Sequence, residues 1–331
     1  MINVSQGCRV DGSQGSREVA LSLRILHVIP FFTPAKGGSA QVVYQMARHL
    51  GERGHSVTVV ASDYRVRDAR FPEGPFETVL LPATIARFGF YVTPTLPGWV
   101  SRNISRFDVI HMHEMRTFQN AVVHSYAHRY NKRYVISAHG TLPIIIQRQT
   151  PKRVYDLMIG NRIISNADLF LAVSPSEAGQ YINAGIPQSR VRVVLNGIDL
   201  CEFVDLPAKG EFRTRYTIPT DVAVILYLGR LHQRKGINTQ IDAFDTIRKD
   251  KPDARLVIAG PDDGELGALK AQVNALQLSE RVCFTGPLYG REKLTAYVDA
   301  DLLVSPAIHE IFGLVPFEAL MCGTPVVVAG D

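Results

Sequence analysis

Short apolar runs alternate with helical stretches along most of this chain, and this alternation restricts the possible folds more than any other feature. The run LRILHVIPFF, which starts at Leu23, precedes two glycines and a stretch of helical spacing, and SVTVVAS, DVIHMHE and RYVISAHG repeat that order. Such alternation is typical of a parallel sheet that helices cover on both faces. The chain is therefore predicted to be an α/β protein.

The alternation is interrupted once and then restarts. Residues 201–220 are polar and irregular and contain two prolines, after which VAVILYLGR begins a second series that reaches PVVVAG. We predict two Rossmann-like, doubly wound parallel sheets, with an N-terminal domain over 23–200, a linker over 201–220 and a C-terminal domain over 221–331. Such sheets are expected to face each other and to bind ligands in the cleft at the carboxyl ends of their strands.

The first 22 residues are polar and rich in glycine and serine, and they lack a hydrophobic signal region. We predict a disordered tail over 1–22. No apolar run in the chain reaches the roughly 18 residues that span a bilayer. A cytoplasmic protein is expected.

Positive charge is concentrated in the first part of the chain. Up to Asp205 there are 22 lysines and arginines against 15 acidic residues, a net charge of +7, and after it 14 against 16, a net charge of −2. A basic half fits an anionic partner, such as a membrane surface or a phosphorylated acceptor, or an ordinary solvated surface. Because no basic tract is interleaved with aromatic residues, no nucleic-acid partner is predicted.

Two places in the first half have residues suited to ligand binding. Gly37 and Gly38 follow the first strand, where small residues let a phosphate approach the backbone N–H groups of a helix N-terminus. The alternative is a tight turn with Ser39 as the helix N-cap. His139, in SAHGT, ends a strand and is expected to point into the cleft, unless it bonds to loop carbonyls instead.

His111 and His113 alternate along the strand DVIHMHE and so face the same way. They suggest a metal-binding pair, but the sequence offers no evident third ligand. We interpret them as structural residues or as residues that support a site without touching the ligand.

The segment GRLHQRKG, from Gly229 to Gly236, follows a strand of the second series. Arg230 and Lys235 surround a glycine-flanked turn before a helix, which suits a pyrophosphate bound by two cations and helix-terminus amides. The order of a P-loop is absent. A surface loop with solvated charges is the alternative.

The segment EIFGLVPFE places Glu310 and Glu318 eight residues apart around the start of a predicted helix. At about 100° per residue, Glu318 lies about 80° from the direction of Glu310, so both can address the N-terminal end of that helix. A carboxylate in such an apolar segment is costly to bury unless hydrogen bonds satisfy it. Ribose or sugar hydroxyls would do so.

Taken in order, these motifs resemble glycosyltransferase family 4. The resemblance consists of a Gly-Gly after the first strand, His139-Gly140, the GR-x4-KG loop and the E-x7-E pair, with VSPSE and NGID between them. It runs from about Leu23 to the last residue. It implies the GT-B fold and transfer of a sugar, with retention of configuration, from UDP, GDP or a related nucleotide to an acceptor. It also implies that neither a divalent metal nor any cofactor is needed, and no Asp-x-Asp pair stands in a suitable place.

The resemblance assigns roles in donor binding. Arg230 and Lys235 would hold the donor diphosphate and neutralise the leaving group, as a metal does elsewhere. Glu318 would accept the ribose hydroxyls and Glu310 would contact the transferred sugar. Backbone N–H groups for sugar and phosphate would come from the start of the same helix, at Phe312, Gly313 and Leu314.

On the N-terminal side, the resemblance places His139 over the sugar, where it steadies the positive charge of an oxocarbenium-like transition state. Gly37 and Gly38 would line the phosphate and acceptor side. No covalent nucleophile is predicted, since Glu310 is the only candidate by residue type and the resemblance argues against it.

The chain departs from the family pattern at its end, after GTPVVVAGD, where members normally continue for several dozen residues. We therefore expect a truncated, incomplete second domain. The leading prediction is a hexosyltransferase of glycan, lipid-linked oligosaccharide or glycolipid synthesis, and a peripheral contact with the inner face of an anionic membrane is also predicted. The alternatives are a catalytically weak or inactive nucleotide-sugar-binding fragment or partner subunit, and a relative such as an epimerase, which the E-x7-E pair and His139 disfavour.

Overall fold

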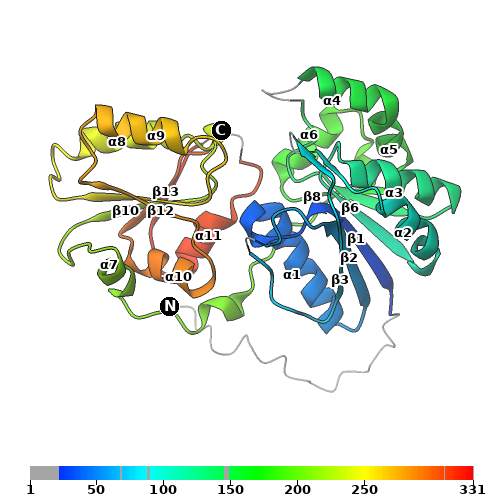
Figure 1. Cartoon of the computed structure of the whole chain (residues 1–331), viewed down its shortest axis with the longest axis horizontal. Helices are drawn as coiled ribbons and strands as arrows, with labels where there is room; N and C mark the ends of the chain where they lie inside the picture. Colours follow the sequence, from blue (N-terminus) through cyan, green and yellow to red (C-terminus); the bar gives the residue numbers. More distant parts are fainter. Residues whose placement is uncertain (1–21, 68, 88–89, 145–148, 309, 331) are drawn as a thin grey trace. The chain divides into compact units, whose positions relative to one another are not determined.

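The computed structural model describes residues 22–330, with the exception of 68, 88–89, 145–148 and 309 (Figure 1). The predicted tail therefore lies outside the described residues, apart from Ser22. The described part forms two compact units, which divide between Gly197 and Ile198. Each unit contains one parallel sheet with helices, so the predicted α/β class with two doubly wound sheets is confirmed.

The N-terminal unit is built on a seven-stranded sheet in which every neighbouring pair is parallel. In spatial order its strands are β3 (Glu77–Leu81), β2 (Ser56–Ser62), β1 (Arg24–Phe31), β6 (Val109–His113), β7 (Tyr134–Ser137), β8 (Leu169–Ala172) and β9 (Val191–Val193). A small antiparallel pair, β4 (Ile85–Arg87) and β5 (Phe90–Val92), stands apart from this sheet.

Helices cover both faces of the seven-stranded sheet. They are α1 (Gly38–Glu52), α2 (Leu96–Asn103), α3 (Phe118–Arg129), α4 (Gln149–Tyr155), α5 (Asn161–Asn166) and α6 (Pro175–Asn183), with a π-helical turn, Asp156–Gly160, between α4 and α5. Because side chains alternate along a strand, β1 contributes to two cores. Ile25 and Ile29 pack with α1, whereas Leu26 and Val28 pack with α2 and α3.

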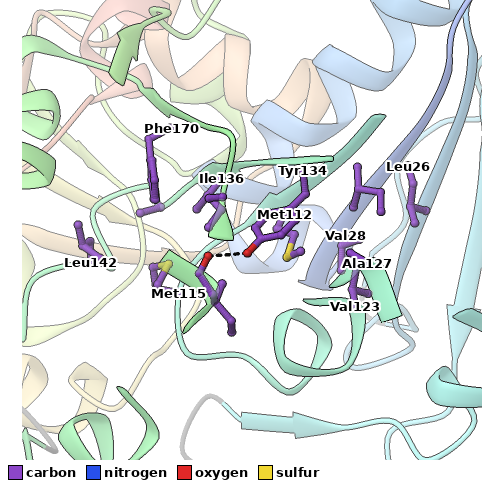
Figure 2. Packing of buried hydrophobic residues seen from close by; sticks show 14 of the residues in the cluster. Leu26, Val28, Met112, Met115, Val123, Ala127, Tyr134, Ile136, Leu142 and Phe170 are labelled. Carbon is purple, nitrogen blue, oxygen red and sulfur yellow. Dashed lines mark hydrogen bonds between the residues drawn. The ribbon is translucent and has the colours of Figure 1, made fainter. Parts of the chain in front are cut away.

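Figure 2 shows the second of these cores at close range. Leu26 and Val28 lie beside Val123 and Ala127 of α3. The buried Tyr134 hydroxyl donates a hydrogen bond of 2.6 Å to the backbone carbonyl of Ile163, so its one polar atom is satisfied inside an apolar cluster. These contacts fix the strands whose carboxyl ends carry the candidate site.

The C-terminal unit has a five-stranded sheet, also parallel throughout. In spatial order its strands are β12 (Val282–Gly286), β11 (Arg255–Ala259), β10 (Val224–Leu228), β13 (Leu302–Ser305) and β14 (Val326–Val328). Helices α8 (Ile237–Ile247) and α9 (Leu266–Ala275) cover one face, and α10 (Gly290–Asp299) and α11 (Leu314–Met321) cover the other (Figure 1).

The polar stretch 201–220, which we predicted as an interdomain linker, is anchored to the C-terminal unit. It contains a short helix, α7 (Glu211–Arg215). The carboxylate of Asp299 accepts hydrogen bonds from the backbone N–H groups of Phe212 and Arg213, at 2.8 and 3.0 Å, and Arg213 also pairs with Asp301 at 2.9 Å. Asp299 and Asp301 form an Asp-x-Asp pair whose carboxylates are both used in holding the chain together.

None of the described helices combines the length and the apolar character that crossing a membrane requires.

Candidate functional site

A row of polar side chains crosses the otherwise apolar face of the N-terminal sheet that α1 covers. His27 shares this face with Ile25 and Ile29, because it lies two residues from each on β1. The parallel register places His27 opposite His111 on β6, and His113 opposite Ser137 on β7. The strand alternation therefore brings three histidines together inside the sheet.

Hydrogen bonds link these rings to one another and to His139. His27 Nδ1 lies 2.9 Å from His113 Nε2, and His113 Nδ1 lies 3.0 Å from His139 Nε2. His111 Nε2 lies 2.8 Å from the Ser137 hydroxyl. The ring of His139 is thus bonded to another histidine and not to a loop carbonyl, which was the alternative from sequence.

The four histidines are neutral at neutral pH, because burial opposes the charged form of an imidazole. Burial lowers the pKa of His27 to about 4 and that of His139 to about 4. It lowers the pKa of His111 and of His113 well below the ordinary value, and the neighbouring rings lower both further.

The backbone around His139 is held in an uncommon conformation. His139 has φ = 50°, in the left-handed region that non-glycine residues rarely occupy. The N–H of Ala138 donates to the Tyr181 hydroxyl at 2.8 Å, and the N–H of Gly140 donates to Glu177 at 2.7 Å. Backbone strain of this kind persists where the surroundings determine it and is concentrated at functional sites.

Glu177 is the central support of this loop, and sequence reasoning missed it. It is fully buried at the start of α6, where the Ser174 hydroxyl accepts from the N–H of Glu177 and the Glu177 carboxylate accepts from the N–H of Val173, a variant of the capping box. Its other carboxylate oxygen reaches Gly140. The signal was present in VSPSE, because Ser-x-x-Glu before a helix is the capping-box pattern.

The Gly-Gly pair stands where it was predicted, between β1 and α1. Gly37 has φ = 86° and is the N-cap of α1, and no side chain caps it. Ser39 is not the N-cap, since its hydroxyl donates to Glu114 at 2.8 Å. The first turn of α1 therefore begins at two residues without side chains, as close approach of a ligand requires.

In the C-terminal unit, the loop after β10 carries both predicted cations. The Tyr227 hydroxyl donates to the Arg230 carbonyl at 3.0 Å and so fixes the start of the loop. Gly236 ends it with φ = 64°, as the N-cap of α8. A Cβ atom at Gly236 would come within 2.5 Å of the Pro306 carbonyl oxygen, so glycine is needed to bring this loop against the one after β13.

Each cation is paired with a carboxylate from a neighbouring loop. Arg230 lies 2.7 Å from Asp263, which follows β11, and both side chains are partly exposed. Lys235 forms an ion pair with Glu310, which follows β13. The structure therefore brings Lys235 and Glu310 together. Because exposed pairs of this kind contribute only about 0–1 kcal/mol, a diphosphate can compete for the cations.

Glu318 has other partners than Glu310. Its buried carboxylate accepts a hydrogen bond of 2.7 Å from the Tyr297 hydroxyl and lies 2.9 Å from Lys293, both on α10. Both partners contact Oε2 and balance the charge, which leaves Oε1 as the acceptor atom to which a hydroxyl could donate. Burial and the nearby Glu318 carboxylate raise the pKa of the Tyr297 hydroxyl well above its usual range.

The segment from Phe312 to Leu314 leads into α11 as predicted. Gly313 is the N-cap, without a side-chain cap, and Leu314 is the first helical residue. The Phe312 ring stacks on Phe317, with ring centroids 5.5 Å apart. The first N–H groups of this helix are thus not satisfied by a capping side chain, which leaves them suited to an anion or a hydroxyl oxygen.

A third potential metal ligand, His27, joins the predicted pair. One nitrogen atom from each of His27, His111 and His113 lies within 4.8 Å of the others. The distance of 2.9 Å between His27 Nδ1 and His113 Nε2 is that of a hydrogen bond. It is shorter than the roughly 3.3 Å that separates two nitrogens on one tetrahedral zinc ion. The arrangement therefore fits shared protons better than a shared metal.

Comparison with known proteins covers both units. Residues 36–202 match the family model described as Glycosyltransferase Family 4, and residues 208–330 match the one described as Glycosyl transferases group 1. A D-inositol 3-phosphate glycosyltransferase from Xylanimonas cellulosilytica is 28% identical over 96% of this chain and 81% of its own length. A GDP-mannose-dependent alpha-(1-6)-phosphatidylinositol dimannoside mannosyltransferase from Mycobacterium tuberculosis is 25% identical, over 93% and 79%.

The fold also matches solved structures. Anabaena HepE, crystallised with UDP-glucose, superposes with a TM-score of 0.73 at 20% identity, over 93% of this chain and 81% of its own.

Proposed function

This chain belongs to the glycosyltransferases that combine a family 4 N-terminal half with a group 1 C-terminal half, and on that premise we propose its reaction. It transfers a hexose, with retention of the anomeric configuration, from a UDP- or GDP-linked sugar. The acceptor is a glycan, a lipid-linked saccharide or a small molecule. The assembly of Arg230, Lys235 and Glu310 at the carboxyl ends of the C-terminal strands carries this proposal.

In the proposed reaction the C-terminal unit binds the donor. Arg230 and Lys235 bind the diphosphate and stabilise the negative charge that develops on it as the glycosidic bond breaks. Glu310 contacts the transferred sugar, Glu318 the ribose, and the N–H groups at Phe312, Gly313 and Leu314 contact sugar and phosphate. In the N-terminal unit, His139 acts on the transferred sugar, and Gly37 and Gly38 line the phosphate and acceptor side.

The proposal is tested by nucleotide release from UDP-glucose and GDP-mannose. Lys235→Ala and Arg230→Ala are each expected to lower turnover by at least about 100-fold, the usual effect of removing one transition-state charge partner. The matched control is Arg234→Ala, an exposed cation of the same loop. Turnover within twofold of wild type in Lys235→Ala would contradict the diphosphate assignment.

Two further measurements separate this proposal from its alternatives. Because two cations take the place of a metal, turnover is expected to persist in EDTA. The anomeric configuration of the product, read by NMR, reports retention. Tight nucleotide-sugar binding by calorimetry, with no turnover on any donor, would instead favour a non-catalytic binding subunit.

We also propose that the N-terminal unit contacts an anionic membrane from the cytoplasmic side. The surface in question, here the α4 surface, consists of Lys152, Arg153, Val154, Leu157 and Met158. Leu157 and Met158 are 83% and 70% exposed, and the basic residues Lys152 and Arg153 precede them in the last turn of α4. Exposed apolar side chains with flanking cations suit a lipid surface.

A further inference from the structure

Three histidines are joined in a row by hydrogen bonds. His27, on β1, meets His113, on β6, at 2.9 Å between Nδ1 and Nε2. His113 then meets His139, after β7, at 3.0 Å between Nδ1 and Nε2. His27 and His113 are fully buried. Each bond needs one nitrogen with a proton and one without, so the protons of the three rings are ordered together.

His27, at the buried end of the row, determines which nitrogen of each ring carries the proton. Nε2 of His27 is buried and has no hydrogen-bond partner among the residues that the structure describes. An N–H group buried without an acceptor is costlier and rarer than an unpaired acceptor atom. The single proton of neutral His27 therefore resides on Nδ1, from which it is donated to His113 Nε2.

The same argument fixes the proton positions on His113 and His139. His113, whose Nε2 accepts, carries its own proton on Nδ1 and donates it to His139 Nε2. His139, whose Nε2 accepts in turn, carries its proton on Nδ1. Within the described ranges no hydrogen bond occupies that Nδ1 atom, and residue His139 is only partly buried.

We infer that His27 and His113 are positioning residues that hold His139 as its Nδ1–H tautomer, ready to donate a hydrogen bond to an oxygen atom of the bound sugar. Nε2 of His139 is then engaged and is not available as a general base. The role toward sugar rests on the proposed function, whereas the proton order rests on the three rings alone. The left-handed backbone of His139 and its supports at Ala138 and Gly140 fix the direction of the same ring.

The proton order is measured by NMR on protein labelled with [15N]histidine. Long-range couplings between the ring nitrogens and ring protons distinguish Nδ1–H from Nε2–H imidazoles. We expect His139 and His113 as Nδ1–H tautomers at pH 7.5, with no sugar present. An Nε2–H tautomer at His139 in the wild-type protein would overturn the inference.

A matched pair of variants tests the transmission through His113. An asparagine at this position places its amide N–H where Nδ1 was, whereas a leucine places no donor there, and both remove the contact with His27. His139 is expected to stay Nδ1–H in His113→Asn and to move toward Nε2–H in His113→Leu. With UDP-glucose, kcat is expected to fall at least about tenfold more in the leucine variant, as for a catalytic histidine that loses its orienting partner. An unchanged tautomer in a folded His113→Leu protein would contradict the inference.

Two further outcomes distinguish the proton order from the proposed role of His139 and from a metal site. If His139→Ala turns over like wild type while the wild-type tautomer is as expected, the role of His139 in the proposed function fails but the proton order stands. If added Zn²⁺ shifts the ring signals of His27, His111 and His113 together at one equivalent, the rings form a metal site and the proton order is overturned.

Discussion

At the scale of single residues, the buried histidines give the N-terminal unit a dependence on pH. Burial lowers the pKa of His27 to about 4, so between about pH 4 and 6.5 the unfolded chain binds a proton that the folded chain does not. The stabilisation that depends on a neutral, buried His27 is therefore complete above pH 6.5, and the free energy of unfolding decreases as the pH falls toward 4. His111, His113 and His139 shift in the same direction.

We expect the free energy of unfolding of the wild-type chain to fall between pH 6.5 and 5.0, by up to about 1.4 kcal/mol per pH unit for each buried histidine. His27→Leu, which removes one such group, is expected to show a smaller slope. Urea denaturation at several pH values measures both. Identical slopes for the two proteins would show that His27 titrates alike in the folded and unfolded chains.

Sequence alone identified part of this site. His139 could be predicted because it ends a strand, and His111 and His113 because they alternate on one. His27 could not, since a lone histidine in LRILHVIPFF is indistinguishable from a core residue until the register of β1 and β6 is known. In the same way, the distance of eight residues could not reveal that Glu318 turns to Tyr297 and Lys293 on another helix.

At the scale of elements, the loop after β10 depends on one glycine. Gly236→Ala is expected to destabilise the C-terminal unit by about 1–3 kcal/mol, because the residue has a positive φ and an added Cβ meets the Pro306 carbonyl. The variant should also weaken nucleotide binding through displacement of Lys235. The matched control is Gly267→Ala in α9, where an added Cβ meets nothing within 4 Å. Thermal denaturation and UDP titration measure the effects, and equal stability of both variants would contradict the argument.

The edge of the C-terminal sheet is expected to be its least protected part. In the region described, β14 pairs with β13 alone, and Val327 and Val328 are more than half exposed. Amides of β14 should exchange orders of magnitude faster than those of β7, and faster than those of β10 in the same sheet. Hydrogen exchange with mass spectrometry resolves the three strands. Equal, strong protection in β14 and β10 would contradict this prediction.

The elements themselves were largely predictable, because apolar runs bounded by glycine and polar residues set strands and helices locally. The short helix within 201–220 could not be predicted from its polar composition. It depends on hydrogen bonds to Asp299, almost ninety residues away in sequence. Long-range hydrogen bonds of this kind leave no periodic signal.

At the scale of the whole molecule, the charge imbalance between the two halves is testable at a membrane. The chain is expected to float with vesicles of phosphatidylserine and phosphatidylcholine at low salt, and less at 0.5 M NaCl, because salt screens the cations. Leu157→Ser with Met158→Ser, on the α4 surface, should reduce flotation severalfold. The control is Ile85→Ser, an exposed apolar residue of β4 outside that surface. Equal flotation of the two variants would exclude the α4 surface as the contact.

The pairing of Arg230 with Asp263 and of Lys235 with Glu310 has a consequence for ligand selection. Each cation carries an internal counter-ion, so arrival of a diphosphate is an exchange of partners and not a simple neutralisation. A lone chloride or inorganic phosphate that displaces one carboxylate gains little over what it removes. A ligand with two linked phosphates can displace both carboxylates in a single binding event, and it gains the chelate advantage that a single ion lacks. On the proposed function, we therefore expect the loop to prefer a diphosphate to a single small anion, because only the diphosphate engages both cations in one binding event.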